Sequence, residues 1–214
     1  MKWLNPAIGD YLAQTSNAAY LIERAALMGD DVQCTEFIDQ EISGIECDRL
    51  EFVGCKFVRC RFLDMNVNRL SFTDCELIGC DLSGLRFMKA GLVRVSMKDC
   101  RLTGADFIEA ALVMAQFTDC LMQYANMSRC KVRGLRLWGC DLSNAAFSEM
   151  EWTGADLRGA KLKASEWRNM SMKGLDFSSC DIEGIVAPLD ALRGATIGVD
   201  QLIELARVVG VKVK

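Results

Sequence analysis

The chain contains no histidine. Histidine is the commonest general acid and base in enzymes, and serine and cysteine triads depend on it, so its absence removes the usual routes to proton transfer and nucleophilic attack. The sequence also contains neither a G-x-x-x-x-G-K nor a G-x-G-x-x-G loop to hold phosphates. We therefore predict a protein that is not an enzyme, with no catalytic residues and no cofactor.

Net charge and long apolar runs are scarce as well. The 25 basic and 29 acidic residues leave a net charge of -4, so composition alone favours neither a nucleic-acid binder nor a heavily acidic protein. No apolar stretch approaches the roughly 18 residues that cross a bilayer, and no basic region followed by an apolar core and a cleavage site opens the chain. We expect a cytoplasmic protein without direct contact to nucleic acid or membrane.

The sequence is dominated by a period of five. Every fifth residue from Phe37 to Ile182 is apolar, and all 10 phenylalanines lie at these positions, which we call the large apolar series. A period of five matches neither a helix, at about 3.6, nor a strand, at about 2, so each unit must turn the chain before the next begins. Repetition of this kind predicts a solenoid, in one continuous domain.

A second series lies two residues before the first and takes smaller residues, for example Cys60, Cys80, Ala105 and Ala125. One large and one small inward residue in every five suits a narrow tube with short strands as its sides. The three remaining positions carry most of the charges and glycines, so we expect them to face water or to form the corners.

Several units resemble the A-[DN]-[LF]-x-x motif of the pentapeptide repeat family, among them residues 80–84, 105–109 and 155–159. The resemblance extends over residues 35–186. It implies an all-β solenoid, a right-handed quadrilateral β-helix with four pentapeptides in each coil. Thirty units would give about seven and a half coils, a rod roughly 35 Å long at the ~4.8 Å spacing of neighbouring strands.

The 11 cysteines raise the question of disulfides or a metal site. On a coil of twenty residues, Cys60, Cys80, Cys100, Cys120 and Cys140 fall in one column. We interpret them as small apolar residues that fill the minor inward position. Parallel side chains and a reducing compartment oppose disulfides. A thiolate metal site is the alternative, although no C-x-x-C pair and no histidine supply the usual zinc spacing.

The two ends depart from the period of five and are expected to cap the solenoid. Residues 1–33 are predicted to form a helical N-terminal cap, with helix from residue 5 to residue 28 that can divide at residues 15–17. The β-helix is predicted over residues 34–198. Residues 199–214 are predicted to form a dimerisation cap, with a helix over 199–209 and a strand over 211–213.

This tail, residues 201–213, resembles the closing helix and strand of the Qnr and MfpA pentapeptide proteins. In that group the C-terminal ends join into an elongated dimer, and the rod imitates B-DNA to bind DNA gyrase. The resemblance implies a homodimer through the C-termini. The apolar residues expected at the interface are Leu202, Leu205, Ala206, Val209, Val211 and Val213.

Two functions from different classes remain open. The first is a non-catalytic scaffold that binds a protein partner through a rod face or its N-terminal helix. The second is a DNA mimic that binds gyrase or a related topoisomerase and changes quinolone sensitivity. A phosphate mimic needs negative potential along its length. One side of the coil supplies candidate acidic residues among several basic ones, and we call these the predicted acidic side: Glu36, Asp39, Glu76, Asp99, Asp119, Asp156 and Asp176.

Overall fold

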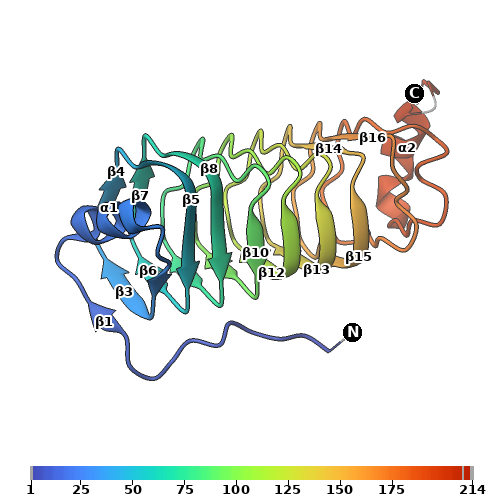
Figure 1. Ribbon diagram of the computed structural model, residues 1–214. Helices are drawn as coiled ribbons and strands as arrows, with labels where there is room; N and C mark the ends of the chain where they lie inside the picture. The colour runs from blue at the N-terminus through green and yellow to red at the C-terminus, as the bar shows by residue number, and fades with distance from the viewer. Residues whose placement is uncertain (1, 209, 213–214) are drawn as a thin grey trace.

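A computed structural model describes residues 2–208 and 210–212 of the chain. The chain winds into a rod of about eight coils with one short helix at each end (Figure 1). Residues twenty positions apart lie side by side in neighbouring coils: Phe37 aligns with Phe57, and Phe57 aligns with Leu77. The predicted right-handed quadrilateral β-helix with helical segments at both ends is confirmed.

One parallel sheet of 12 strands forms two adjacent sides of the rod. Strands β12 (Ala111–Thr118) and β13 (Lys131–Trp138) are long enough to continue around the corner between these sides. The other members of the sheet are β1 (Ala13–Gln14), β2 (Val32–Gln33), β3 (Thr35–Ile38), β5 (Glu46–Val53), β6 (Lys56–Val58), β8 (Asn66–Thr73), β9 (Glu76–Ile78), β10 (Gly91–Val93), β11 (Ser96–Lys98) and β15 (Glu151–Asp156).

The remaining two sides consist mainly of turns. One of them carries a two-stranded sheet near the N-terminal end, which pairs β4 (Glu41–Ser43) with β7 (Arg61–Leu63). The other carries a two-stranded sheet near the C-terminal end, which pairs β14 (Ala146–Ser148) with β16 (Glu166–Arg168). Between them, single parallel bridges such as Asp81 to Arg101 continue the stacking. The coil is therefore held by regular strands on two sides and by single bridges and turns on the other two.

The corners explain why the period is five. In nearly every unit, the residue two positions after the large apolar residue has a positive φ, as Gly84 (67°) and Tyr124 (60°) do. This left-handed conformation bends the backbone, and only glycine adopts it without a steric penalty. Glycine, asparagine and aspartate therefore recur there, and the corners, like the core, repeat every five residues.

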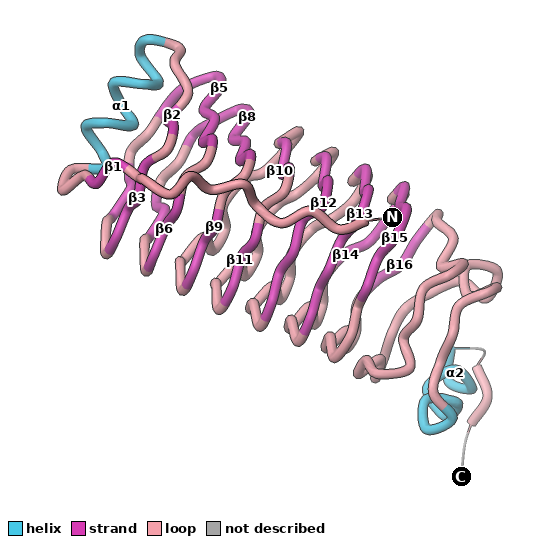
Figure 2. The backbone as a smooth tube through the Cα atoms, turned by 90° about the horizontal axis from the view of Figure 1, so that it is seen from below, coloured by secondary structure: helices cyan, strands magenta, loops and turns pink. Residues whose placement is uncertain are grey.

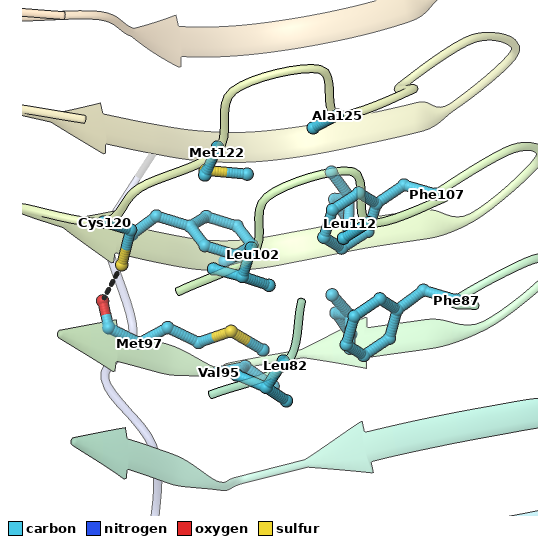
Figure 3. Close-up of a cluster of buried hydrophobic side chains, with 14 of the residues drawn as sticks. Leu82, Phe87, Val95, Met97, Leu102, Phe107, Leu112, Cys120, Met122 and Ala125 are labelled. Carbon is cyan, nitrogen blue, oxygen red and sulfur yellow. Dashed lines mark hydrogen bonds between the residues drawn. The ribbon is translucent and has the colours of Figure 1, made fainter. Parts of the chain in front are cut away.

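The large apolar series fills the core. All of its members are buried except Cys47 and Trp152, which are half-buried. Trp152 lies further out because its indole Nε1 donates a hydrogen bond to the Ser171 carbonyl, 3.1 Å away. Aromatic rings stack from coil to coil, and the ring centroids of Phe87 and Phe107 are 4.7 Å apart (Figure 3). The small series lines the same tube.

Nine of the eleven cysteines are buried, Cys47 is half-buried and Cys34 is exposed; all are free thiols. The buried thiols lie beside backbone carbonyls: Cys120 Sγ donates to the Met97 oxygen, 3.5 Å away (Figure 3). Burial raises the pKa of Cys130 to about 12 and that of Cys180 to about 11. In the described ranges, no group of three or more cysteine or carboxylate side chains could hold a metal ion.

These thiols make a testable prediction. Only exposed thiolates react rapidly with a thiol reagent. In the native protein, the exposed Cys34 should therefore be modified quickly and the nine buried cysteines slowly. Unfolding in denaturant should then expose all 11 cysteines as free thiols. A Cys34→Ser variant is the control, since it should remove only the rapid phase. Stoichiometric zinc or copper in the purified protein would contradict the packing interpretation.

The N-terminal prediction is wrong in one respect. The helix α1 covers only Ala18–Met28, where Asn17 accepts the hydrogen bond of the Tyr20 amide and Ala18 and Ile22 pack against the first coil. Residues 2–12, which we call the N-terminal arm, are extended and run back along the rod (Figures 1 and 2). Gly9 disfavours a helix in this segment, and the hydrogen bond from the Ala7 amide to Asp74 holds it extended.

The C-terminal helix is shorter than predicted. A 3-10 turn, η1 (Val199–Gln201), is followed by α2 (Leu202–Val208). Val211 and Lys212 do not form the predicted strand, since they have no strand partner among the described residues. Val209 and Val213, two of the predicted interface residues, lie outside the described residues.

Candidate interaction surfaces

Outward side chains form straight columns along the rod, because each residue stacks on the one twenty positions later. Opposite charges alternate in several columns and pair between neighbouring coils. Arg59 holds Asp39 through two hydrogen bonds of 2.6 and 2.7 Å, and Arg61 lies 3.5 Å from Glu41. Each such exposed ion pair contributes little to the free energy of folding, about 0 to 1 kcal/mol. Their main effect is to cancel charge along the rod.

The residues of the predicted acidic side face outward along one side of the rod, and basic residues pair with three of them. Glu36 lies 3.6 Å from Lys56, and Asp156 lies 2.7 Å from Arg158. The hydrogen bond from Arg59 lowers the pKa of Asp39. Four members have no ion pair within the described part of the chain: Glu76, Asp99, Asp119 and Asp176.

The N-terminal arm lies along this same side (Figure 2). It is anchored near the first coils, where β1 pairs with β3 and the Gln14 amide donates to Glu36, 3.2 Å away. Midway, the Ala7 amide donates to Asp74 Oδ1 at 2.9 Å. Arg94, through hydrogen bonds of 2.6 and 2.5 Å, and the Ala7 amide both lower the pKa of Asp74. The carboxylate thus stays ionised and available as an acceptor at neutral pH.

The free end of the arm rests on a stack of cations and aromatic rings. The Arg136 guanidinium lies 3.8 Å from the centre of the Trp3 ring and 4.6 Å from the centre of the Trp138 ring. Arg158 covers the same Trp138 ring, also at 4.6 Å. Gln116 Oε1 accepts a hydrogen bond from Arg136 at 3.2 Å and keeps the guanidinium in place. Cation–π contacts of this kind contribute about 0.5–1 kcal/mol at exposed sites.

A cleft of about 710 Å³ lies between the arm and the rod. The arm contributes Ile8, Tyr11 and Leu12 to its lining. The rod contributes Glu76 and Met114. Polar and apolar groups therefore both face the space, and the arm is not packed tightly against the coils along its length.

The C-terminal cap closes the last coil with polar side chains. The buried Gln201 accepts from the Gly198 amide at 2.8 Å and donates to the carbonyls of Phe177 and Cys180 at 2.7 and 2.6 Å. Glu204 accepts from the Gly184 amide at 3.2 Å and also pairs with Arg207. These side chains take the place of the coil that would otherwise follow.

The predicted interface residues have different environments. Leu202 is 55% exposed and Val211 is 53% exposed, whereas Leu205 and Ala206 are half-buried. Ile203 and Val199 are also exposed and extend the apolar surface of the cap. The sequence pattern predicted an apolar side at 202, 205 and 206, yet it is α2 packing on the coil that decides which of these residues remain accessible.

Comparison with known proteins places this architecture in a family. The family model described as a pentapeptide repeat region matches residues 70–147, and the model for pentapeptide repeats in eight copies matches residues 153–186. Together they cover more than half of the chain. The chain belongs to the pentapeptide repeat family. No curated protein matches its sequence.

Solved structures similar to this pentapeptide repeat protein include a trypsin-treated variant of QnrB1, a plasmid-mediated fluoroquinolone resistance protein. It is 23% identical, with 87% of this chain and 91% of that chain covered and a TM-score of 0.44. Full-length QnrB1 is 24% identical, with 86% and 91% covered and a TM-score of 0.37. HetL, involved in heterocyst differentiation regulation in the cyanobacterium Nostoc sp., is 16% identical, with 81% and 92% covered and a TM-score of 0.33.

Several residues of these surfaces were not identified from the sequence of this pentapeptide repeat protein. Trp3 and Arg136 are far apart in the chain, and Gln201 occupies a position that faces outward in every regular unit. No periodic signal in the sequence distinguishes them from their neighbours.

Within the described residues, no helix is both long and apolar enough to span a bilayer.

Proposed function

We propose that this pentapeptide repeat protein is a non-catalytic scaffold that binds another protein through the surface of its rod. The observation that carries the proposal is the in-register stacking of the coils (Figure 1), which places outward residues in straight, parallel columns and gives flat sides several coils long. A flat, mixed-charge surface of this kind suits a protein partner, because interfaces combine polar rims with apolar anchors. The free thiols of the core suit the reducing cytoplasm, where we place the protein.

The test of this proposal is a complex of purified components. A partner recovered with the full chain should re-form a stoichiometric complex when both proteins are purified separately and mixed, as measured by calorimetry. Variants with reversed charge on one side, such as Lys98→Glu with Asp99→Lys, should weaken the complex only when that side is used. If no partner re-forms a complex, the scaffold proposal fails.

We further propose that two chains associate through their C-terminal caps. The exposed apolar residues Leu202, Ile203 and Val211 on the cap support this, because one short helix does not need them to cover one coil. A twofold arrangement would bring the same surface of two copies together. The result would be a particle about twice as long as one rod.

The dimer makes a prediction for light scattering. Full-length protein at micromolar concentration should have the mass of two chains, and Leu202→Glu should have the mass of one, because a charge would be buried at the interface. Deleting residues 199–214 should give monomer or aggregate, since it also uncovers the last coil. Leu27→Glu is the matched control: this leucine is 86% exposed on α1 at the other end and should leave the dimer intact. A monomeric full-length chain would rule the dimer out.

The narrower alternative is a DNA mimic that binds DNA gyrase. An elongated dimer would support it, whereas the pairing of charges between coils favours the broader proposal, since a phosphate mimic requires unpaired negative charge along its length. A supercoiling assay with purified gyrase, with and without a quinolone, distinguishes them. Inhibition or protection at micromolar protein, lost in Asp99→Asn with Asp119→Asn, would favour the mimic; no effect on either reaction would exclude it.

A further inference from the structure

Hydrogen bonds and ring contacts fix the described part of the N-terminal arm to the rod at three places. Its base is fixed by β1, where the Ala13 amide donates to the Cys34 carbonyl at 2.8 Å. Its middle is fixed by Ala7 on Asp74, and its free end by Trp3 on Arg136. Within residues 2–12 of the described chain, no other backbone amide has a protein acceptor. Each coil, by contrast, is bonded to its neighbours along its whole length.

The segments between these anchors are loosely held. Tyr11 is 94% exposed and Leu4 is 49% exposed. Residues of the arm and of the rod together line the cleft beneath the arm. An extended segment with so few contacts can leave the rod at low cost, because exposed segments with few buried contacts open most readily. The arm therefore resembles a bound peptide more than a part of the core.

The spacing of the two outer anchors matches an extended chain. Asp74 and Arg136 lie three coils apart, which is about 14 Å at ~4.8 Å per coil. Trp3 and Ala7 are four residues apart, which spans about 13–14 Å when fully extended. The same four residues in a helix would span only about 6 Å. The groove thus selects an extended segment with an aromatic ring four residues before a free amide.

We propose that this groove, from Asp74 to Arg136, is the site at which the scaffold binds an extended peptide of its partner, and that the N-terminal arm occupies it in competition. The inference rests on the proposed scaffold function and names its binding site. Arg136, supported by the Trp138 ring, receives the aromatic side chain, and the ionised Asp74, held by Arg94, receives the backbone amide. A partner must displace the arm to bind.

The experiment uses a labelled synthetic peptide of residues 2–14 and fluorescence anisotropy. Wild-type protein, whose own arm fills the groove, should bind the peptide weakly. Full-length Trp3→Ala, whose arm has lost its aromatic anchor, should bind it about fivefold more tightly. In the Trp3→Ala background, Arg136→Ala should lose about fivefold in affinity. A peptide with alanine in place of Trp3 should lose a similar factor.

Arg158→Ala in the same background is the matched control. It removes the other guanidinium from the Trp138 ring but not the contact with Trp3, so peptide affinity should stay within about twofold. Equal binding by wild type and Trp3→Ala, or equal losses with Arg136→Ala and Arg158→Ala, would overturn the groove proposal. Neither result affects the purified-partner experiment, so failure of the groove and failure of the scaffold are distinguishable.

Discussion

Phe107→Ala is expected to lower the free energy of unfolding by about 3 to 5 kcal/mol, because it removes a large buried side chain and leaves a cavity. Phe107 lies in the middle of the rod with no exposed surface. Its ring stacks on Phe87 (Figure 3). It also meets the Phe117 ring edge-on, with the two ring centroids 6.1 Å apart. Because coils above and below are regular, the surrounding backbone has little freedom to close the cavity. Denaturation in urea, monitored by circular dichroism, measures the loss.

Tyr124→Ala is the control for this measurement. Tyr124 is an aromatic residue in the next coil, but it is 64% exposed at a corner, so its loss should cost less than about 1 kcal/mol. A loss below about 1 kcal/mol for Phe107→Ala would contradict its inward position. Similar losses for the two variants would show that the assay reports something other than core packing.

Gln201→Leu should have the second-largest effect, about 2 to 4 kcal/mol. The leucine keeps the volume but leaves the Cys180 carbonyl without its donor and the Gly198 amide without its acceptor, and each unsatisfied buried group costs about 1–3 kcal/mol. The Phe177 carbonyl keeps the hydrogen bond from the Cys180 amide, 2.8 Å long. The damage should be local to the last coil. Hydrogen exchange of the Phe177 amide, which is bonded to the Thr196 carbonyl at 2.8 Å, should become faster.

Gln123→Leu is the matched control for the cap. The same substitution on an outward, half-buried glutamine leaves its partners in contact with water, so the stability should change by less than about 1 kcal/mol. Exchange near Phe177 should be unchanged in this variant. If Gln201→Leu leaves exchange at the last coil as it is in wild type, the proposed role of Gln201 in closing the rod is wrong.

The sequence predicted the coils well because one physical requirement repeats at every fifth residue. A position such as Phe107 must be apolar in any coil, so the pattern alone identifies it. The ends have no such repetition. The helix predicted from residue 5 rested on apolar spacing, but Gly9 and the anchor at Asp74 favour an extended arm. Gln201 is buried only because the chain leaves the coil at η1.

The candidate surfaces were harder to predict than the fold. Position in the coil correctly placed Glu36 and Asp39 on one side, but the net potential depends on Lys56 and Arg59 in the adjacent coil, and on the arm that crosses them. The contact of Trp3 with Arg136 joins residues that share no pattern. Fold follows from a local repeat, whereas these contacts follow from three-dimensional placement.

The alternating charge columns have a consequence for folding. The apolar core is almost the same in every coil, so a strand that docked one coil too far along would still bury its large apolar residue. In the first coils, that misaligned state would place Glu36 beside Glu76 and Glu41 beside Asp81, because Lys56 and Arg61 separate these carboxylates in the native register. Like charges at that spacing repel. The charges of these two columns therefore oppose a shift of one coil that the apolar core alone would tolerate.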